Sequence, residues 1–271
     1  MKILILGGNG FVGSNLTSNL SRFFTVNSAS RTVSETNLYF DIHQPASYSV
    51  CDESYDVIIN CIVDYSASLE KSMAHDLVSK RAFLLYLQSI KTHYIEISSV
   101  SAIDENKFLS DYNFNKFLQE QVLYYSTLEN KFDFSVLRYG QIISENGQSR
   151  KSQGAFHYFV DCFRNQTTLN VFGNPNVPRS YMPIDVLVQT VHHCITEKIK
   201  GAHNVIMPDT YSANDLISTF SKYTSQPNLN YDPERFAFEY FIPSCSDSFV
   251  TLLAQFSCEN VFKNSLLTNE I

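Results

Sequence analysis

The chain has 271 residues, of which 44% are apolar and 14% aromatic, and its formal net charge is −7. A chain of this length can bury roughly 70 to 75% of its unfolded surface, so we expect an ordinary globular protein. Acidic and basic residues are interspersed, and the longest apolar runs fall far short of the roughly 20 residues of a membrane span, so we expect neither a nucleic-acid nor a membrane partner.

Strands and helices are predicted to alternate up to about residue 140. An aliphatic run at residues 2–6 predicts a short buried strand, and apolar residues at helical spacing predict a helix over 11–20. This alternation indicates βαβ units and a doubly wound, parallel α/β (Rossmann) sheet. The further strands are predicted at residues 24–29, 38–40, 56–62, 94–98 and 134–137, and the further helices at 75–90 and 113–125.

The alternation loosens beyond about residue 141. Helices are predicted at 155–164, 185–197 and 213–223, with a strand at 203–207, and the tail after Pro227 has no clear period. We expect a dinucleotide-binding domain over 1–140, with returning segments near 180–206. Residues 141–271 are expected to form mostly a smaller substrate-binding region.

Directly behind the first strand the sequence reads GGNGFVG, which contains the pattern G-x-x-G-x-x-G. Glycine permits the tight turn, the close approach of backbone to a pyrophosphate, and the packing of helix on strand. The following helix start supplies free N–H groups and a positive dipole end. The turn therefore predicts a dinucleotide-phosphate site, with a ligand-free turn as the alternative. Its cofactor-binding candidates are Gly7, Gly10, Phe11, Val12 and Gly13.

The end of the second predicted strand bears on the choice of dinucleotide. An acidic residue there would bind the ribose 2′-hydroxyl of NAD, whereas an arginine accommodates the extra phosphate of NADP. The segment from Val26 to Thr32 has no carboxylate, and Arg31 lies 18 residues after Gly13. The sequence thus favours NADP(H) over NAD(H), with a solvated loop arginine as the alternative.

A tyrosine and a lysine stand four residues apart at Tyr112 and Lys116. On a helix they share one face, and a nearby ammonium stabilises a phenolate, which makes Tyr112 a candidate general acid or base. The strand before them ends at Ser98-Ser99, where open α/β sheets bind their ligands. A serine hydroxyl at this edge could hydrogen-bond the reacting oxygen.

With these motifs the sequence resembles the extended short-chain dehydrogenase/reductases, the branch that modifies sugar nucleotides, to about residue 223. The turn GGNGFVG is similar to their glycine signature, and Tyr112, Lys116 and Glu120 match Tyr-x-x-x-Lys-x-x-x-Glu. The resemblance implies that Tyr112 exchanges a proton with the substrate oxygen and that Lys116 holds the nicotinamide ribose. It also implies that Ser99 orients the substrate and that Ser101 contacts it.

The same resemblance implies further binding residues. Asp41 and Ile42 look like the pair beside the adenine, and Tyr139 and Gly140 resemble the segment on the nicotinamide side. Arg179 matches an arginine that grips the nucleotide diphosphate of the substrate in many members. The 13 residues from Ser99 to Tyr112 are about half the usual spacing in extended members, which puts the identity of the substrate in doubt.

The function we expect is an NADP(H)-dependent reductase of a keto-sugar nucleotide, for example a 4-keto-6-deoxy sugar, because Arg31 is present and the acidic residue is missing. The alternatives are an NAD-dependent sugar-nucleotide epimerase and a non-catalytic NADP-binding sensor. The particular sugar, the nucleotide and the stereochemical outcome do not follow from the sequence.

The six cysteines are scattered without a metal-ligand or disulfide pattern, so we expect no metal and reduced thiols in a cytoplasmic protein. Only four aliphatic residues follow Met1-Lys2 before the first glycine, too few for the core of a secretory signal. The family resemblance implies a homodimer that forms through the helices at 75–90 and 113–125.

Overall fold

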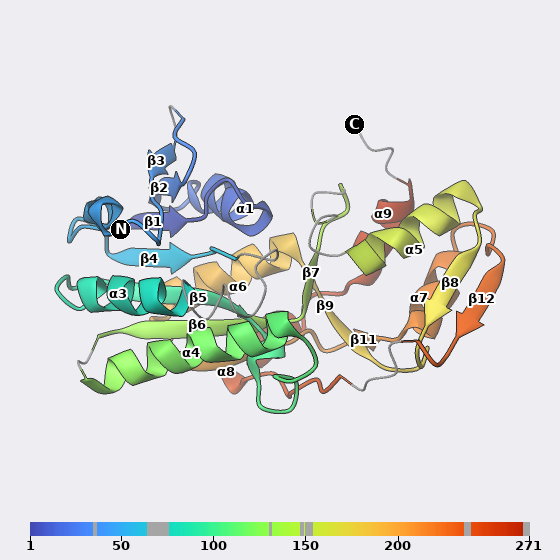
Figure 1. Cartoon of the computed structure of the whole chain (residues 1–271). Coiled ribbons are helices and arrows are strands. Elements are labelled where there is room, and N and C mark those ends of the chain that lie inside the picture. The colour runs from blue at the N-terminus through green and yellow to red at the C-terminus, as the bar shows by residue number, and fades with distance from the viewer. Residues whose placement is uncertain are drawn as a thin grey trace. The chain divides into compact units, whose positions relative to one another are not determined.

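Strands and helices alternate through the first half of the chain in the computed structural model (Figure 1). By its backbone contacts the chain divides into two units. Unit 1 comprises Met1–Arg138 and Val188–Asn204, and unit 2 comprises Tyr139–Leu187 and Val205–Ile271. The structure describes residues 1–34, 37–63, 76–129, 132–146, 149, 154–235 and 240–267.

Unit 1 is built on a mostly parallel sheet. Within the described residues the sheet has seven strands in the order β10-β6-β5-β4-β1-β2-β3. Strand β1 pairs in parallel with β2 and β4, and the pairs β2–β3 and β4–β5 are also parallel. This is the strand order of a doubly wound Rossmann sheet, which confirms the predicted fold class. The strands are β1 Lys2–Leu6, β2 Thr25–Ser30, β3 Asn37–Tyr39, β4 Val57–Asn60, β5 His93–Ser99, β6 Phe134–Tyr139 and β10 Gly201–Val205.

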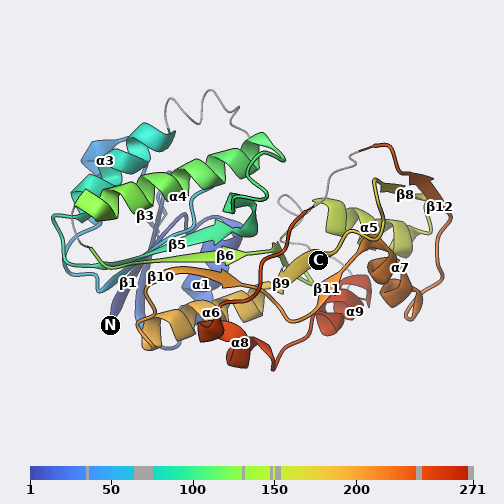
Figure 2. The same cartoon turned by 90° about the horizontal axis from the view of Figure 1, so that it is seen from below.

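Helices cover both faces of this sheet. Figures 1 and 2 show α1 and α6 against one face and α3 and α4 against the other. The helices are α1 Phe11–Leu20, α3 Leu77–Leu87, α4 Asp111–Glu129 and α6 Ile184–Thr196, and two short 3₁₀ segments are η1 Pro45–Val50 and η3 Val100–Ala102. The first residue of the helix predicted over 75–90, His75, lies outside the described residues.

The core of unit 1 explains its uninterrupted apolar runs. Residues 3–6 of β1 have no exposed surface, because this central strand is covered on both faces. An aromatic cluster adds to the core: the ring of Phe83 on α3 lies 5.1 Å from the rings of both Phe40 and Tyr48. The glycine turn that follows β1 therefore starts from a strand that is fully buried in the core.

Unit 2 combines two small sheets with four helices among its described residues. One sheet has the order β11-β9-β7, and the other pairs β12 with β8 in parallel. Helix α7 begins with a capping box, in which the Ser212 hydroxyl and the Asp215 carboxylate each accept from the other's backbone N–H. The elements are β7 Gln141–Ile143, α5 Gly154–Asn165, β8 Leu169–Phe172, β9 Arg179–Pro183, β11 Thr210–Tyr211, α7 Ala213–Ser221, β12 Leu229–Asp232, α8 Asp247–Leu253 and α9 Glu259–Leu267.

The described residues of the tail after Pro227 form β12, α8 and α9, although the sequence shows no period there. Strand β12 carries polar residues and is specified by its backbone pairing with β8. Helix α9 is anchored by one large side chain, Phe262, whose ring lies 4.8 Å from the ring of Tyr211 and 5.6 Å from that of Tyr181. Neither kind of contact leaves a pattern in the local sequence.

Candidate functional site

The turn between β1 and α1 requires glycine at two positions. Gly7 has φ +84°, in the left-handed region, and a Cβ on it would lie 3.1 Å from the carbonyl carbon of Cys61. A Cβ on Gly13 would overlap the carbonyl oxygen of Gly7. The Gly7 N–H donates to the Ala29 carbonyl at 2.8 Å. Glycine thus lets the turn pack closely against the ends of β2 and β4.

Helix α1 begins at this turn without a side-chain cap. Its N-cap residue is Gly10, which has no side chain, and the first hydrogen bond of the helix runs from the Ser14 N–H to the Gly10 carbonyl at 2.9 Å. The N–H groups of residues 11–13 therefore have no acceptor within the helix. Together with the positive end of the helix dipole, they favour an anionic group such as a phosphate.

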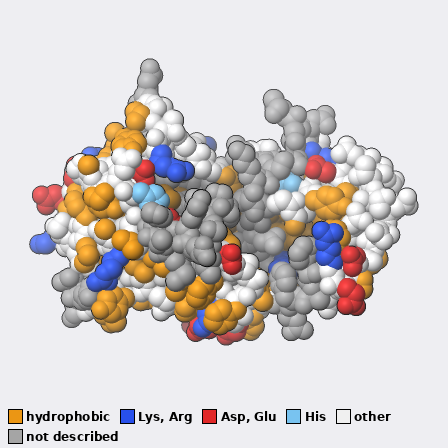
Figure 3. Space-filling view, viewed as in Figure 1, with side chains coloured by type: hydrophobic (Ala, Val, Ile, Leu, Met, Phe, Trp, Pro, Cys, Tyr) orange, Lys and Arg blue, Asp and Glu red, His pale blue; other side chains and the backbone are white. Residues whose placement is uncertain are grey.

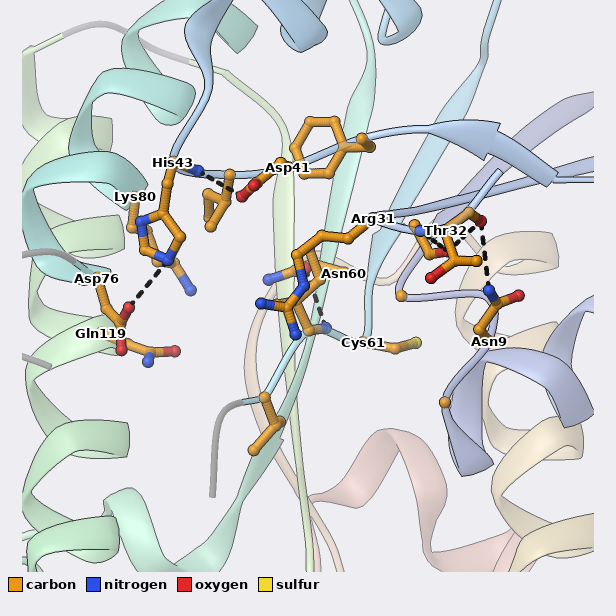
Figure 4. Close-up of a pocket in the computed structure, with 17 residues that line it drawn as sticks. Asn9, Arg31, Thr32, Asp41, His43, Asn60, Cys61, Asp76, Lys80 and Gln119 are labelled. Carbon is orange, nitrogen blue, oxygen red and sulfur yellow. Dashed lines mark hydrogen bonds and ion pairs between the residues drawn. The ribbon is translucent and has the colours of Figure 1, made fainter. Parts of the chain in front are cut away.

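A cavity of about 330 Å³ opens at this turn, and all of its lining residues belong to unit 1 (Figure 4). It lies at the carboxyl ends of β1, β2 and β4, where ligands bind in open α/β sheets. Its walls consist of the glycine turn, the chain at and after the ends of β2, β3 and β4, and parts of α3 and α4. The lining residues are Gly7, Asn9, Gly10, Ser30, Arg31, Thr32, Phe40, Asp41, Ile42, His43, Asn60, Cys61, Ile62, Val63, Asp76, Lys80 and Gln119.

Five of the predicted cofactor residues meet in this cavity: Gly7, Gly10, Arg31, Asp41 and Ile42. The other three from the glycine turn, Phe11, Val12 and Gly13, form the first turn of α1 and shape the helix start. Tyr139 and Gly140 belong to unit 2. There Tyr139 is fully buried, and Gly140 packs so closely on Ser180 that a Cβ would overlap its carbonyl oxygen.

The end of β2 is fixed by the buried amide of Asn37. Its Nδ2 donates to Ser30 Oγ at 2.6 Å and to the Thr32 carbonyl at 2.7 Å. Figure 4 shows Arg31, which lies between these two residues, extending into the cavity. The Asp41 carboxylate accepts hydrogen bonds within its own turn, from the His43 N–H and the Gln44 side chain. The carboxylate that lines this part of the cavity is thus engaged locally.

Three serines stand where β5 ends, and the structure distinguishes them. The Ser98 hydroxyl donates to Glu120 Oε1 at 2.5 Å, so this side chain is engaged in the interior. Ser99 is the last residue of β5, and its Oγ accepts from the Ser101 N–H at 3.1 Å. Ser101 is 7% exposed. Ser99 thus stands at the end of the strand with an Oγ that accepts from a backbone N–H and carries a proton of its own.

Tyr112 and Lys116 lie one turn apart near the start of α4, with Tyr112 partly buried. Lys116 is 4% exposed, and its Nζ has no hydrogen-bond partner among the described residues. Burial lowers the pKa of this ammonium, and the carboxylates of Glu96 and Glu120 oppose the shift. A buried donor without a partner calls for an acceptor, which fits the hydroxyl groups of a nicotinamide ribose.

Arg179, the predicted substrate residue, lies at the start of β9 in unit 2. The centre of its guanidinium group is 5.0 Å from the centroid of the Tyr240 ring, a cation–π contact. Residues 236–239, which include Phe236 and Phe238, lie outside the described residues.

Sequence reasoning missed a buried ion pair beside the cavity. Lys80 Nζ lies 2.7 Å from Glu96 Oε1, and the two side chains are 3% and 2% exposed. Glu96 Oε2 accepts from the Tyr94 hydroxyl at 2.5 Å and from Asn60 Nδ2 at 3.0 Å. The available signal was Glu96 inside the strand HYIEISS and the Lys80-Arg81 pair inside the helix LVSKRAFLLYL.

The described residues contain no group of three or more His, Cys, Asp and Glu side chains that could hold a metal ion. All six cysteines are free thiols. None of the helices in the described part of the chain is long and apolar enough to cross a membrane.

Together, the sheet order, the glycine turn and the cavity define a Rossmann-fold enzyme of the short-chain dehydrogenase/reductase type. The chain belongs to the NAD dependent epimerase/dehydratase family, whose family model matches residues 3–207. No curated protein sequence matches the chain.

Several solved structures are similar to the chain over nearly its whole length. UDP-glucuronic acid 4-epimerase from Bacillus cereus, in complex with UDP-glucuronic acid and NAD, is 18% identical, with a TM-score of 0.80 and 98% of both chains covered. UDP-glucose 4-epimerase from Thermus thermophilus, in complex with NAD, is 12% identical, with a TM-score of 0.79 and the same coverage. UDP-N-acetylglucosamine 4-epimerase from Bacillus cereus is also 12% identical, with a TM-score of 0.79, and covers 100% of this chain and 98% of that one. At these identities the likeness establishes the shared fold.

Proposed function

We propose that the protein is a sugar-nucleotide 4-epimerase that uses NAD. The observation that carries the proposal is the buried Lys116 ammonium, which has no partner among the described residues and stands one turn from Tyr112 in the unit that holds the glycine-turn cavity. Family membership supports the nicotinamide cofactor. The three similar structures described above are all 4-epimerases of UDP-sugars, and two of them are complexes with NAD, which supports the reaction and the coenzyme.

In this proposal the dinucleotide binds at the glycine turn. The free N–H groups at the start of α1 bind a phosphate, and Asp41 and Ile42 lie beside the adenine. Lys116 donates from its ammonium to the nicotinamide ribose. Tyr139 and Gly140, from unit 2, line the nicotinamide side, as the family resemblance implies.

When bound, the dinucleotide accepts a hydride from the sugar and returns it. Tyr112 takes the proton of the sugar hydroxyl as the hydride leaves and gives it back to the oxygen when the hydride returns. The Lys116 ammonium stabilises the phenolate that Tyr112 forms in between. Ser99 donates a hydrogen bond to the same oxygen, Ser101 contacts the substrate, and Arg179 binds the nucleotide diphosphate with the bidentate geometry that arginine offers.

The sequence alone favoured the reductase over the epimerase. This proposal reverses that preference, because the family and the similar structures support the epimerase. One observation still favours an NADP(H)-dependent reductase as the second candidate. Arg31 lines the cavity, and the described residues at the end of β2, 25–34, include no carboxylate. An arginine in that position suits the extra phosphate of NADP.

The two candidates differ in what happens to the coenzyme. The protein is purified, its bound nucleotide is released by denaturation and identified by mass spectrometry, and the protein is then incubated with UDP-glucose or UDP-glucuronic acid. For the epimerase we expect retained NAD and conversion to the 4-epimer, seen by NMR, without added coenzyme. Stoichiometric consumption of NADPH with a keto-sugar nucleotide, and no 4-epimer, would instead establish the reductase.

We also propose that α3 and α4 form the interface of a homodimer. Hydrophobic side chains gather over these helices in Figure 3. Val78 and Leu85 on α3 are 66% and 44% exposed, and Tyr125 and Leu128 on α4 are 55% and 83% exposed. Apolar side chains exposed on two adjacent helices are typical of a protein–protein contact.

A further inference from the structure

The buried ion pair of Lys80 on α3 and Glu96 on β5 is a poor device for stability alone. Removing two charges from water is expensive, and well-packed apolar residues often serve a fold as well or better. The pair is nevertheless almost completely buried, with Nζ and Oε1 2.7 Å apart. This placement suggests a role at the neighbouring cavity.

Glu96 is held as a carboxylate by its surroundings. Burial by itself raises the pKa of Glu96, but the ammonium groups of Lys80 and Lys116 and the hydrogen bond from Tyr94 outweigh it, so the pKa lies below its ordinary value. The second oxygen accepts from Tyr94 and from Asn60, which itself lines the cavity. The carboxylate is therefore a fixed anchor on the sheet side of Lys80.

Lys80 lines the cavity and still has hydrogen-bond donors to offer. Figure 4 shows it on the side of the cavity that also carries His43, Asp76 and Gln119. One of its donors is engaged by Glu96 Oε1 at 2.7 Å, and no second partner for Nζ is found among the described residues. An ammonium carries three donors, so a ligand in the cavity can accept from it.

The buried charges behind this wall comprise three cations and two carboxylates. Glu120 is already paired with Arg138, whose Nη2 lies 2.6 Å from Glu120 Oε2. Glu96 is paired with Lys80, and Lys116 remains as the third cation against two carboxylates. Asp41 and Asp76 also line the cavity, but Asp41 accepts hydrogen bonds within its own turn and Asp76 lies 3.4 Å from His43. The unpaired cation behind the wall therefore favours a negatively charged ligand, such as the diphosphate of a dinucleotide.

We propose that Lys80 is a second lysine of the dinucleotide site, donating to a phosphate or ribose oxygen of the cofactor, and that Glu96 is the residue that positions it. The proposal rests on the dinucleotide site of the proposed function. It adds a binding contact from α3 that neither the glycine turn nor the Tyr112–Lys116 pair supplies.

The test is calorimetric titration with NADH of the full-length protein stripped of nucleotide. The variant is the double substitution Lys80→Met with Glu96→Gln, which removes both charges at nearly constant volume, and the matched control is Lys91→Met at an exposed lysine. We expect the double variant to keep its cooperative thermal unfolding and to bind NADH at least tenfold more weakly, with Lys91→Met unchanged. Wild-type affinity in the folded double variant would overturn the proposal. A wild-type protein that binds neither NADH nor NADPH would overturn the proposed function as well.

Further ligands identify the contacted oxygen. A loss of affinity with ADP assigns Lys80 to the diphosphate or the adenosine ribose, and adenosine separates these two. A loss with ADP-ribose but not with ADP assigns Lys80 to the second ribose. A loss with NADH alone would contradict the proposal, because the contact would then involve the nicotinamide.

The positioning role of Glu96 has its own readout, the pH dependence of NADH affinity. In Glu96→Gln the ammonium groups lose the carboxylate that favours their charged form, so the affinity should decline at a lower pH than in wild type. If NADH affinity declined at the same pH in Glu96→Gln and in wild type, the positioning role of Glu96 would be contradicted. A purely structural residue would weaken binding equally at every pH. The groups that interact electrostatically with Lys80, Glu96 and Lys116 are Cys61, Tyr94 and Glu120, and all are retained in this variant.

Discussion

Lys116 differs from the other buried cations of unit 1 in having no carboxylate of its own. Lys80 pairs with Glu96, and Arg138 pairs with Glu120. Each of these two cations therefore has a carboxylate within ion-pair distance, whereas the Lys116 ammonium has no partner among the described residues. A buried donor left unpaired is costly to the folded protein, so its position one turn after Tyr112 is best explained by a ligand that binds there.

Replacing Tyr112 by phenylalanine removes the proton donor and preserves the ring. We expect turnover of the UDP-sugar to fall about 10²- to 10⁴-fold, the usual contribution of a positioned acid or base, with dinucleotide affinity changed little. The measurement is the initial rate of 4-epimer formation by NMR. Tyr125→Phe, at an exposed tyrosine of the same helix, should retain full activity. Full activity of Tyr112→Phe would instead support a protein that binds the cofactor without catalysis.

Replacing Arg31 by alanine tests the end of β2. Only NADPH carries the extra phosphate, so we expect its affinity to fall about tenfold, or about 1.4 kcal/mol, and that of NADH to change less than about twofold. Calorimetric titration with both coenzymes checks this, and Arg22→Ala, at an exposed arginine after α1, is the control. Equal losses for both coenzymes would show that Arg31 contacts a part that they share.

At the scale of elements, the glycine turn shows how local sequence and tertiary packing combine. The spacing of the glycines predicted the turn and the helix behind it. The reason for Gly13, however, is the Gly7 carbonyl oxygen that a Cβ would overlap, and the reason for Gly7 is partly the Cys61 backbone from a different strand. The same turn therefore depends on β4 as well as on its own sequence.

Gly13→Ala should damage both stability and binding. The added Cβ forces the turn away from α1, and overpacking of this kind costs about 1–3 kcal/mol of unfolding free energy. We expect that loss in urea denaturation, together with weaker NADH binding. The matched control is Gly154→Ala at the first residue of α5, where a Cβ meets nothing within 4 Å. Its stability should be unchanged or raised by up to about 1 kcal/mol, and an equal loss in both variants would contradict the packing argument.

At the scale of the whole molecule, the buried Lys80–Glu96 pair predicts how stability depends on pH. The pKa of Glu96 is lower in the folded protein than in the unfolded chain, so its contribution to stability is present above the unfolded pKa and is lost as pH falls through the folded pKa. Wild type should therefore lose more stability below about pH 4.3 than the double variant Lys80→Met with Glu96→Gln. Urea denaturation between pH 7 and 3 checks this, and parallel losses would contradict it.

The proposed dimer is tested by a charge on its apolar surface. Leu128→Glu places a carboxylate on a residue that is 83% exposed on α4, and burying it in an interface would be costly. We expect wild type to sediment as a dimer and the variant as a monomer of 30.9 kDa at the same concentration. Val250→Glu on α8 is the control for a surface charge in unit 2, and a dimer that persists in Leu128→Glu would exclude this interface.

Much of unit 1 could be predicted because its signals are local. The strand at residues 2–6 matches β1, and the strand predicted at 94–98 matches β5 within one residue at each end. Buried parallel strands appear in a sequence as aliphatic runs, and helices that cover a sheet appear as apolar residues at helical spacing. The roles of Ser99, Tyr112 and Lys116 remain predictions.

The sequence by itself determined the fold class, the family and the glycine turn, since each rests on short-range patterns. Only the tertiary structure decided which of the cofactor candidates share one cavity, that Lys80 and Glu96 meet beside it, and that the tail forms β12, α8 and α9. These features join residues from separate elements. Lys80 and Glu96 come from α3 and β5, and β12 pairs with β8 from about 60 residues earlier. Contacts of this kind are set by how elements pack, and no local period records them.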